Sequence, residues 1–450
     1  MSLVLEVVVV LHDVEEIPDE EHEQVTGRVC AIDVAKESGK VCTRVPHESR
    51  PGGRVCKVWD VEATTRSVIE LADHLAGEGI EVVTVESTSD YWRIFFYLLE
   101  ARGLKVQLVN ARDVKNVPGR PKTDKLDAVW LAKLTEKGLL RPSFVPPAEI
   151  RRLRDYTRTR TDLTQERTRY WSRLEKLLED ALIKVSSVAS KIDGMSVRDM
   201  VEALIAGERN PRVLAGLARG RLKAKYTALI CALNGQFDEH HAELARILLD
   251  QIDGLSSQID KLTVRIEELA AGLTAAAAPA GGGEGDQPTL PTVERLMEVP
   301  GIAHRGAQVI LAEIGLDMSR FATAGHLVSW AKLCPRTIQS GAKSSAARSG
   351  KGNPYLKGIL GEAAAAAKTE TFLGERYRRI VKRRGKLKAL VAVARSILVI
   401  IWHLLADPTA RYRDLGPDYH ASRIDQGRKA RNHIRQLEAL GYSVTLSPAA

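Results

Sequence analysis

Short apolar runs rich in β-branched residues begin at Gly27 and are separated by turn residues. Three of these runs, residues 28–34, 40–45 and 54–61, are typical of strands. The sequence then alternates between helical and strand patterns, with helices expected over 65–78, 90–102 and 123–137 and strands over 81–85 and 105–109. Three meandering strands followed by this alternation predict an α/β domain over residues 27–146, with a mixed sheet flanked by helices.

The pattern changes at the start of the next region, residues 147–273. Up to about residue 192, Gly and Pro almost disappear, and Leu and Ile recur at helical spacing. Residues 239–273 carry apolar positions every three or four residues over several heptads, which is a coiled-coil signature. We expect this surface to pair with another copy of the chain in a dimer or tetramer. The alternative is that two helices pack only on each other.

Two stretches are expected to lie outside the folded domains. Residues 1–26 are an acidic extension, since the first 24 positions hold eight acids and no Lys or Arg. Residues 274–289 are rich in Ala, Gly and Pro and predict a flexible linker. The remaining residues, 290–450, predict a mainly α domain with a basic composition.

The charge balance favours a polyanionic partner. Lys and Arg outnumber Asp and Glu by 66 to 57, and the pI is about 9.2, although the first 24 residues are acidic. Long-range attraction to phosphates is the simplest use of such an excess, and the alternative is a basic protein that merely stays soluble. The candidate nucleic-acid contacts form one basic segment: Arg376, Arg379, Lys382, Arg383, Arg384 and Lys386. A solvated basic face is the other interpretation of this segment.

The cysteines and the apolar run near the N-terminus give information on the cellular compartment of the protein. The five cysteines are scattered and form no CxxC pair, so they indicate neither a zinc site nor a disulfide framework. A reducing cytoplasm fits this pattern. Residues 3–11 are apolar, but the run is short and lacks a basic flank, so we expect neither a membrane span nor a signal peptide.

Four acids are candidates for a metal site: Asp33, Glu86, Asp124 and Asp127. Asp33 and Glu86 each follow the apolar core of a predicted strand, where an acid costs stability unless it is solvated or bound to a cation. Asp124 and Asp127 are three residues apart at the start of a predicted helix and therefore share a face. Asp124 can alternatively be a simple helix cap, because a helix N-terminus favours negative charge. The order of the predicted strands and helices allows all four acids to lie together at one edge of the sheet.

Such a cluster has a clear chemical use. Carboxylates crowded together repel one another unless hard cations lie between them, and oxygen ligands suit Mg²⁺ or Mn²⁺. Two such ions about 4 Å apart can hold the attacking and leaving oxygens of a phosphodiester. We therefore expect the four acids to be the metal ligands and catalytic residues of a site with two Mg²⁺ ions that acts on nucleic acid, with Mn²⁺ as a possible substitute.

Three motifs surround these acids: IDVAK (32–36), VESTSDYW (85–92) and KTDKLDA (122–128). They resemble the ribonuclease-H-like (RuvC-like) domain of the DEDD-type insertion-sequence transposases, the family that includes the Piv invertase and the bridge-RNA-guided recombinases. The second motif departs from the more frequent M-E-A-T-G-x-Y at Ser87 and Ser89. The third is the most specific, and the resemblance implies that its aspartates, here Asp124 and Asp127, are metal ligands.

The carboxy-terminal domain carries motifs of the same family. LMEVPGI (296–302) and LAEIG (311–315) are similar to its transposase domain, and the Pro300-Gly301 step indicates either a phosphate-binding hairpin or a tight packing turn. CPRTIQSG (334–341) and RSGKGN (348–353) resemble the family's P-x-x-x-x-S-G and s-K-x-G-N stretch. The family uses a serine there as a nucleophile, and the resemblance assigns that role to Ser340. The neighbouring candidates are Ser344, Ser345 and Ser349.

The resemblance implies a DNA transposase or recombinase in which Ser340 attacks a phosphate held at the metal site and forms a phosphoserine–DNA intermediate. It also implies DNA partners at the element ends and the target, a structured noncoding guide RNA, and a location at the bacterial nucleoid. Two other hypotheses stay open. The first is a metal-dependent, junction-resolving endonuclease of the RuvC type without a covalent intermediate. The second is a nonenzymatic nucleic-acid-binding protein that assembles through its coiled coil.

Overall fold

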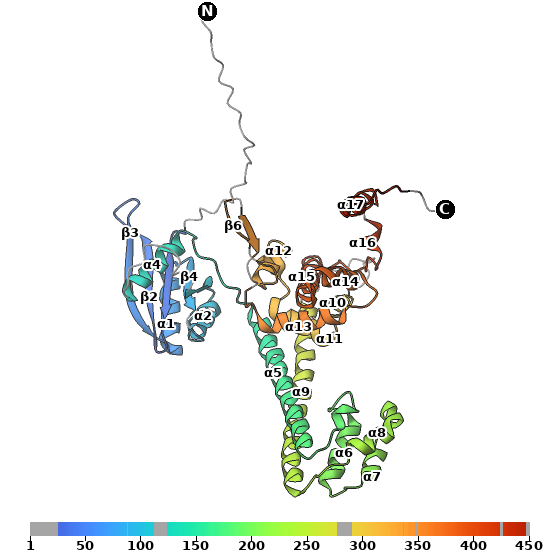
Figure 1. Ribbon diagram of the computed structural model, residues 1–450. Helices are drawn as coiled ribbons and strands as arrows, with labels where there is room; N and C mark the ends of the chain where they lie inside the picture. The colour runs from blue at the N-terminus through green and yellow to red at the C-terminus, as the bar shows by residue number, and fades with distance from the viewer. Residues whose placement is uncertain are drawn as a thin grey trace, which may run out of the picture. The chain divides into compact units, whose positions relative to one another are not determined.

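The computed structural model describes residues 26–87, 89–111, 124–276, 290–335, 337–341, 343–346, 350–423 and 426–446. The predicted acidic extension, apart from its last residue, and most of the predicted linker lie outside these residues. The chain divides into two compact units, unit 1 up to Val145 and unit 2 from Pro146 (Figure 1). Each unit is described by itself below.

Unit 1 is built on a five-stranded sheet with the order β3-β2-β1-β4-β5. The elements begin and end close to the predicted positions: β1 Val29–Val34, β2 Ser38–Pro46, β3 Arg54–Glu62, α1 Thr65–Gly77, β4 Val82–Ser87, α2 Trp92–Ala101, β5 Val106–Asn110 and α4 Asp124–Glu136. Strands β1, β2 and β3 form an antiparallel meander, whereas β4 runs parallel to β1 and β5 runs parallel to β4. The predicted mixed sheet is confirmed, and the arrangement is compatible with a ribonuclease-H-like domain.

The two faces of this sheet are covered by different helices, because side chains alternate along each strand. Ile32 and Val85 point into a core that they share with α1 and α2. Ala31, which precedes Ile32 on β1, points to the opposite face and packs with Leu131 of α4. Residues of odd number on β1 and of even number on β4 therefore face α4.

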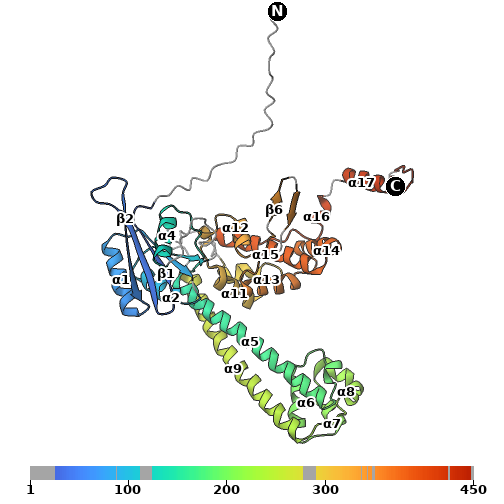
Figure 2. The ribbon, with the colours of Figure 1, turned by 60° about the vertical axis from the view of Figure 1, so that its left-hand side comes forward.

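Unit 2 begins with an arm of two long helices, α5 Ala148–Asp180 and α9 Glu239–Ala276, which pack side by side (Figures 1 and 2). Helix α9 buries positions spaced by three, four or seven residues, namely Ala245, Leu249, Ile252, Ile259 and Ile266. This is the heptad pattern that we assigned mainly to a second copy of the chain. Pairing between α5 and α9 within the chain already accounts for it, so the dimer or tetramer stays a prediction without support from this stripe.

The far ends of α5 and α9 are joined by a small helical cap that the sequence had not predicted. It consists of η1 Val185–Ser187, α6 Met195–Ile205, α7 Pro211–Gly216, η2 Gly220–Lys225 and α8 Tyr226–Ala232. These elements share one apolar core with the end of α5 and the start of α9, which includes Leu178, Met200 and Leu249. The other end of α9 continues to Ala276, three residues into the segment that we predicted as a linker.

The carboxy-terminal part of unit 2 is mainly helical, as predicted. Its elements are α10 Thr292–Met297, α11 His304–Ile314, η3 Met318–Arg320, α12 Ala324–Trp330, β6 Thr337–Ser340, β7 Lys343–Ala346, α13 Pro354–Ala366, α14 Phe372–Arg384, α15 Lys386–Ala406, α16 Tyr419–Ser422 and α17 Gln426–Glu438. Strands β6 and β7 form an antiparallel hairpin in the stretch that carries the CPRTIQSG motif. Helix α11 also contacts α5, which attaches the arm to this part of the unit.

Helix α15 is long and apolar enough to cross a membrane by length and composition. In the structure it contacts α10, α12, α13 and α14, and it buries eight residues that include Val393, Ile397 and Ile401. This burial explains its apolar character as that of a central helix in a folded domain.

Candidate active site

Asp33 and Glu86 lie at the same end of two neighbouring parallel strands. The pairing of β1 with β4 aligns Ile32 with Val85, and Asp33 and Glu86 are the next residues on the two strands. Both lie on the face that is covered by α4, because Ile32 and Val85 point to the other face. Glu86 is buried, with 5% of its surface exposed, and Asp33 is half-buried. The strand register thus brings together the two acids that were predicted from separate motifs.

Helix α4 runs antiparallel to β1. Glu136, the last residue of α4, accepts a hydrogen bond at its carbonyl oxygen from the backbone of Thr26, which precedes β1. The Thr135 hydroxyl lies 2.7 Å from that of Thr84, in the middle of β4. The first turn of α4 therefore points towards the strand ends that carry Asp33 and Glu86.

This first turn carries the other two predicted acids. Asp124 is the first residue of α4, and its side chain lies outside the described residues. Asp127 is half-buried one turn into the helix and is followed by Ala128, which packs against the sheet. The backbone therefore places the first turn of α4, which carries Asp124 and Asp127, towards the edge where Asp33 and Glu86 lie.

The residues at this edge fit a hard divalent cation. Its candidate ligands are all carboxylates, and Glu86 is a buried acid on the same edge and face as Asp33. Oxygen-only ligand sets of this kind suit Mg²⁺ or Mn²⁺ better than metals that prefer nitrogen or sulfur. At the opposite end of α4, the buried Glu136 forms ion pairs with Arg44 and Arg54.

Ser340 lies in unit 2, at the tip of the β6–β7 hairpin. It is the last residue of β6 and pairs in register with Lys343, the first residue of β7. The alternative serines, Ser344 and Ser345, pair with Gln339 and Ile338 further from the tip. The side chains of the hairpin and the whole of Ser349 lie outside the described residues. The backbone alone therefore places Ser340 nearer to the turn than either alternative on β7.

Asn353, the last residue of the K-x-G-N motif, connects the segment after this hairpin to the core. Its side-chain oxygen caps α13 by accepting hydrogen bonds from the backbone of Tyr355 and Leu356. Its side-chain nitrogen donates to Glu313 Oε2 over 2.5 Å. An Asn followed by Pro is a signal for a helix start, so the cap could have been predicted from the sequence, whereas the bond to Glu313 could not.

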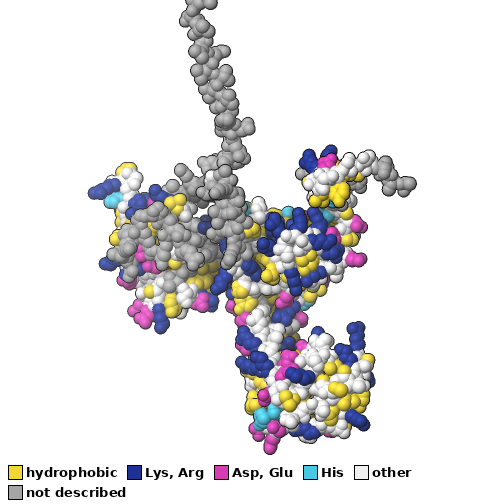
Figure 3. All heavy atoms as spheres, in the orientation of Figure 1, with side chains coloured by type: hydrophobic (Ala, Val, Ile, Leu, Met, Phe, Trp, Pro, Cys, Tyr) yellow, Lys and Arg dark blue, Asp and Glu magenta, His cyan; other side chains and the backbone are white. Residues whose placement is uncertain are grey.

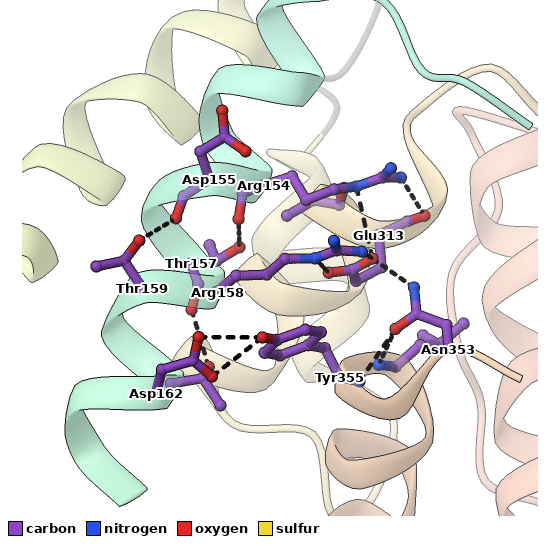
Figure 4. Close-up of polar contacts among 12 residues, drawn as sticks. Arg154, Asp155, Thr157, Arg158, Thr159, Asp162, Glu313, Asn353 and Tyr355 are labelled. Carbon is purple, nitrogen blue, oxygen red and sulfur yellow. Dashed lines mark hydrogen bonds and ion pairs between the residues drawn. The ribbon is translucent and has the colours of Figure 1, made fainter. Parts of the chain in front are cut away.

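Glu313 is the centre of a polar network that the sequence did not reveal (Figure 4). It is fully buried on α11 and accepts two hydrogen bonds from Arg158 of α5, over 2.7 and 2.8 Å. Arg154, one turn earlier on α5, donates to the backbone oxygens of Ala312 and Glu313. Burial alone lowers the pKa of Arg158, but the bonds and the charge of Glu313 raise it above its ordinary value overall. The network joins α5, α11 and the cap of α13.

The turn between α10 and α11 is tightly packed. Gly301 has φ +92°, and a Cβ atom at this position would lie 2.2 Å from the carbonyl oxygen of Ala363 on α13. Only glycine fits such a close approach in this backbone conformation. Of the two interpretations of the Pro300-Gly301 step, the structure therefore supports the packing turn.

The predicted basic segment spans the end of α14 and the start of α15. Arg379, Lys382, Arg383, Arg384 and Lys386 are exposed, and none lies within ion-pair distance of an acidic residue in the described parts of the chain. Lys and Arg side chains gather over this region in Figure 3. Arg376 differs from the others, because it is half-buried and its pKa is lowered by burial and by the charges of Arg395 and Arg379.

Comparison with known proteins places these features in one family. A model of the DEDD transposases of the IS110 type, described as a transposase, matches residues 30–183, the stretch that holds the four acids. A second model, described as "Transposase IS116/IS110/IS902 family", matches residues 293–378, which include the β6–β7 hairpin and Asn353. The chain belongs to the IS110 family of transposases. The family resemblance seen in the motifs is thereby confirmed, and both halves of this IS110-family chain contribute to it.

A curated relative supports the same assignment over a shorter stretch. The "Insertion element IS110 uncharacterized 43.6 kDa protein" of Streptomyces coelicolor is 32% identical to this IS110-family chain over 117 residues. The match covers 25% of the chain and 29% of the relative.

Proposed function

We propose that this IS110-family chain is the DNA transposase of an insertion sequence, which cleaves and rejoins DNA by phosphodiester transesterification. The family assignment supports the reaction class. The observation that carries the proposal is the register of β1 and β4, which aligns Asp33 with Glu86 on the face covered by α4. Helix α4 directs its first turn, with Asp124 and Asp127, to the same edge.

In this proposal the four acids hold two Mg²⁺ ions, for which Mn²⁺ can substitute. Bound there, such ions would stabilise the negative charge that develops on a phosphodiester during the reaction. The chain contributes the fixed positions of the ligands. Strand register orders Asp33 relative to Glu86, and packing of Ala128 and Leu131 on the sheet orders the first turn of α4.

Ser340 is the proposed nucleophile, and its hydroxyl attacks the phosphorus of a DNA phosphodiester. The carboxylates of unit 1 would hold the metal ions that offset the negative charge of this phosphate. A bond forms between the serine oxygen and phosphorus, and the bond from phosphorus to one DNA oxygen breaks. The serine proton goes to a base, and the released DNA oxygen takes up a proton and leaves as a hydroxyl group. A DNA hydroxyl later attacks the phosphoserine, which restores Ser340 and joins the new strand. The number of phosphoester bonds is unchanged, so this recombination needs no external energy source.

The decisive experiment is adduct trapping with labelled DNA that carries the element ends, in the presence of Mg²⁺. The wild-type chain should give a covalent protein–DNA adduct. Ser340→Ala should bind the same DNA with unchanged affinity and give no adduct, whereas Ser344→Ala and Ser345→Ala should retain it. An adduct that persists in Ser340→Ala would overturn the assignment of the nucleophile. Nicked DNA without any adduct in the wild type would favour a junction-resolving endonuclease instead.

The basic segment is the proposed contact surface for nucleic acid, including a structured guide RNA. Its exposed cations lie without acidic neighbours among the described residues, so their charge is available to phosphates. Replacing Arg379, Lys382, Arg383 and Lys386 by Gln should reduce the salt dependence of RNA binding, with a slope smaller by about 3 in log K against log salt.

A matched control removes cations that already have acidic partners. Arg378, which pairs with Glu375 over 2.9 Å, and Arg198, which pairs with Asp253, are suitable for substitution by Gln. This control should leave the salt slope within about one unit of the wild type. Equal slopes for the two sets of variants would show that the basic segment is only a solvated face.

A further inference from the structure

A cluster of histidines and acids lies at the end of the arm where the helical cap begins. Asp180 is the last residue of α5, Asp238 directly precedes α9, and His240 and His241 lie in the first turn of α9. Figure 3 shows the histidine and acidic side chains gathered at this end of the arm. The two histidines lie outside both stretches that match the family models, so the DNA chemistry proposed above does not involve them.

The spacing of the polar atoms fits coordination better than direct hydrogen bonding. His241 Nε2 lies 3.4 Å from Asp180 Oδ2, which is long for a charged hydrogen bond. Two atoms that each bind a tetrahedral zinc ion at about 2.0–2.1 Å lie about 3.4 Å apart. Asp180, His240 and His241 can each offer one ligand atom, and all three atoms lie within 4.8 Å of one another. A single ion can therefore contact all three residues.

His241 is held in one orientation by its surroundings. Its side chain is 5% exposed, and its ring packs 5.5 Å from the ring of Phe237 and 3.9 Å from that of His240. Its Nδ1 atom lies 2.5 Å from Asp238 Oδ1, which leaves Nε2 directed towards Asp180. Histidines that bind metals usually donate their second ring nitrogen to a carboxylate in this way. Asp238 thus takes the place of the outer carboxylate that orients a metal ligand.

A purely structural role explains part of this arrangement. Asp238 lies just before α9 and accepts a long hydrogen bond from the backbone of His241, as a helix cap does. His240 Nδ1 also lies 2.7 Å from Asp238 Oδ1, so contacts with Asp238 account for both histidines, but they do not require Asp180 of another helix. The ring centres of His240 and His241 lie 3.9 Å apart, and imidazole is a common metal ligand.

We propose that Asp180, His240 and His241 bind one divalent transition-metal ion, with Zn²⁺ as the best fit. Two imidazole nitrogens and one carboxylate oxygen form a zinc ligand set, whereas Mg²⁺ prefers oxygen ligands alone. A water molecule completes the coordination. The ion links the end of α5 to the start of α9. Residues 181–238, which form the helical cap, then make a loop whose two ends are held together by the ion. Binding of this kind stabilises the folded arm.

The test measures zinc binding to the full chain by competition with a chromophoric chelator, with excess Mg²⁺ present to occupy the carboxylate edge of unit 1. The wild type should bind one more zinc ion per chain than a variant with His240→Ala and Asp180→Asn. Both of these side chains are mostly exposed, at 60% and 74%, so the variant should fold. Asp238→Asn should keep the site but weaken it by about 10–100-fold, because it loses only the orienting carboxylate.

Controls separate a metal site from a folding effect. His326→Ala removes an exposed histidine on α12 and should bind zinc like the wild type. Without metal, the double variant should unfold at the same temperature as the wild type, whereas added zinc should raise only the wild-type midpoint. Equal zinc stoichiometry in the wild type and the double variant, or equal thermal shifts with zinc, would overturn the proposal. Neither result depends on DNA cleavage, so the proposed transposase activity is tested separately.

Discussion

Two buried glutamates, one in each unit, have different neighbours in the structure. Glu313 is fully buried on α11, and the chain itself supplies its cations, since Arg158 binds both of its oxygens and Arg154 lies 3.5 Å away. Glu86 is 5% exposed at the end of β4, and the residue beside it on the neighbouring strand is another acid, Asp33. Arginines of the chain hold Glu313, whereas Glu86 has an acid at the adjacent position of the neighbouring strand.

This difference distinguishes Glu313, a carboxylate that stabilises the fold, from Glu86, which we propose as a metal ligand. A buried charge is tolerated when geometry and hydrogen bonds compensate for its desolvation, and the Arg158–Glu313 pair provides both. Acids gathered at one edge are instead suited to bind divalent cations from solution. Substitution of Glu313 should therefore affect mainly folding, and substitution of Glu86 should affect mainly activity.

The largest effect is expected for Glu86→Gln. The amide keeps the shape of the side chain but loses the charge that holds a metal ion, so DNA cleavage in Mg²⁺ should fall at least about 1,000-fold, or about 4 kcal/mol in activation free energy. The thermal midpoint without divalent metal should stay close to that of the wild type. Added Mg²⁺ should raise the midpoint of the wild type more than that of the variant.

Glu70→Gln is the matched control for this substitution. Glu70 lies on α1 of the same unit and forms an exposed pair with Arg66, so its substitution should leave both cleavage and the response to Mg²⁺ unchanged. If Glu86→Gln cleaves DNA at the wild-type rate, the carboxylate edge is not the catalytic site and the contrast with Glu313 has no functional meaning.

The next largest effect is expected for Glu313→Ala. Removing one partner of a buried ion pair leaves the other charge uncompensated, which costs about 3 kcal/mol of unfolding free energy for unit 2. We choose the low end of the usual range because the Arg158 side chain is 35% exposed. Urea unfolding followed by circular dichroism measures the change. Glu375→Gln, which removes the more exposed pair with Arg378 on α14, should change stability by less than about 1 kcal/mol.

The two glutamates also differ in how far their roles could be predicted from the sequence. Glu86 was found because an acid directly after an apolar strand core is unusual, and strand order then indicated where it would lie. Glu313 sits inside a similar apolar run, LAEIG, but its partner Arg158 is 155 residues away along the chain. Periodicity shows that α5 and α9 each have an apolar face, yet it does not tell which helix covers which face. Pairings of this kind depend on tertiary packing and were available only from the structure.

The smallest of these effects, and the most specific, concerns Asn353. Its oxygen caps α13 and its nitrogen donates to Glu313, so Asn353→Ala loses both contacts and should lower the free energy of unfolding by about 1–2 kcal/mol.

Asn353→Asp keeps an oxygen for the cap but places a second negative charge next to Glu313. If Glu313 is a fixed anion held by arginines, the Asp variant should be at least as destabilised as the Ala variant at pH 7, and it should regain stability as the pH is lowered and the new carboxyl becomes protonated. Urea unfolding at pH 7 and pH 5 measures both changes. An Asp variant as stable as the wild type at pH 7 would mean that the cap alone matters and that Glu313 does not carry the charge on which the comparison with Glu86 rests.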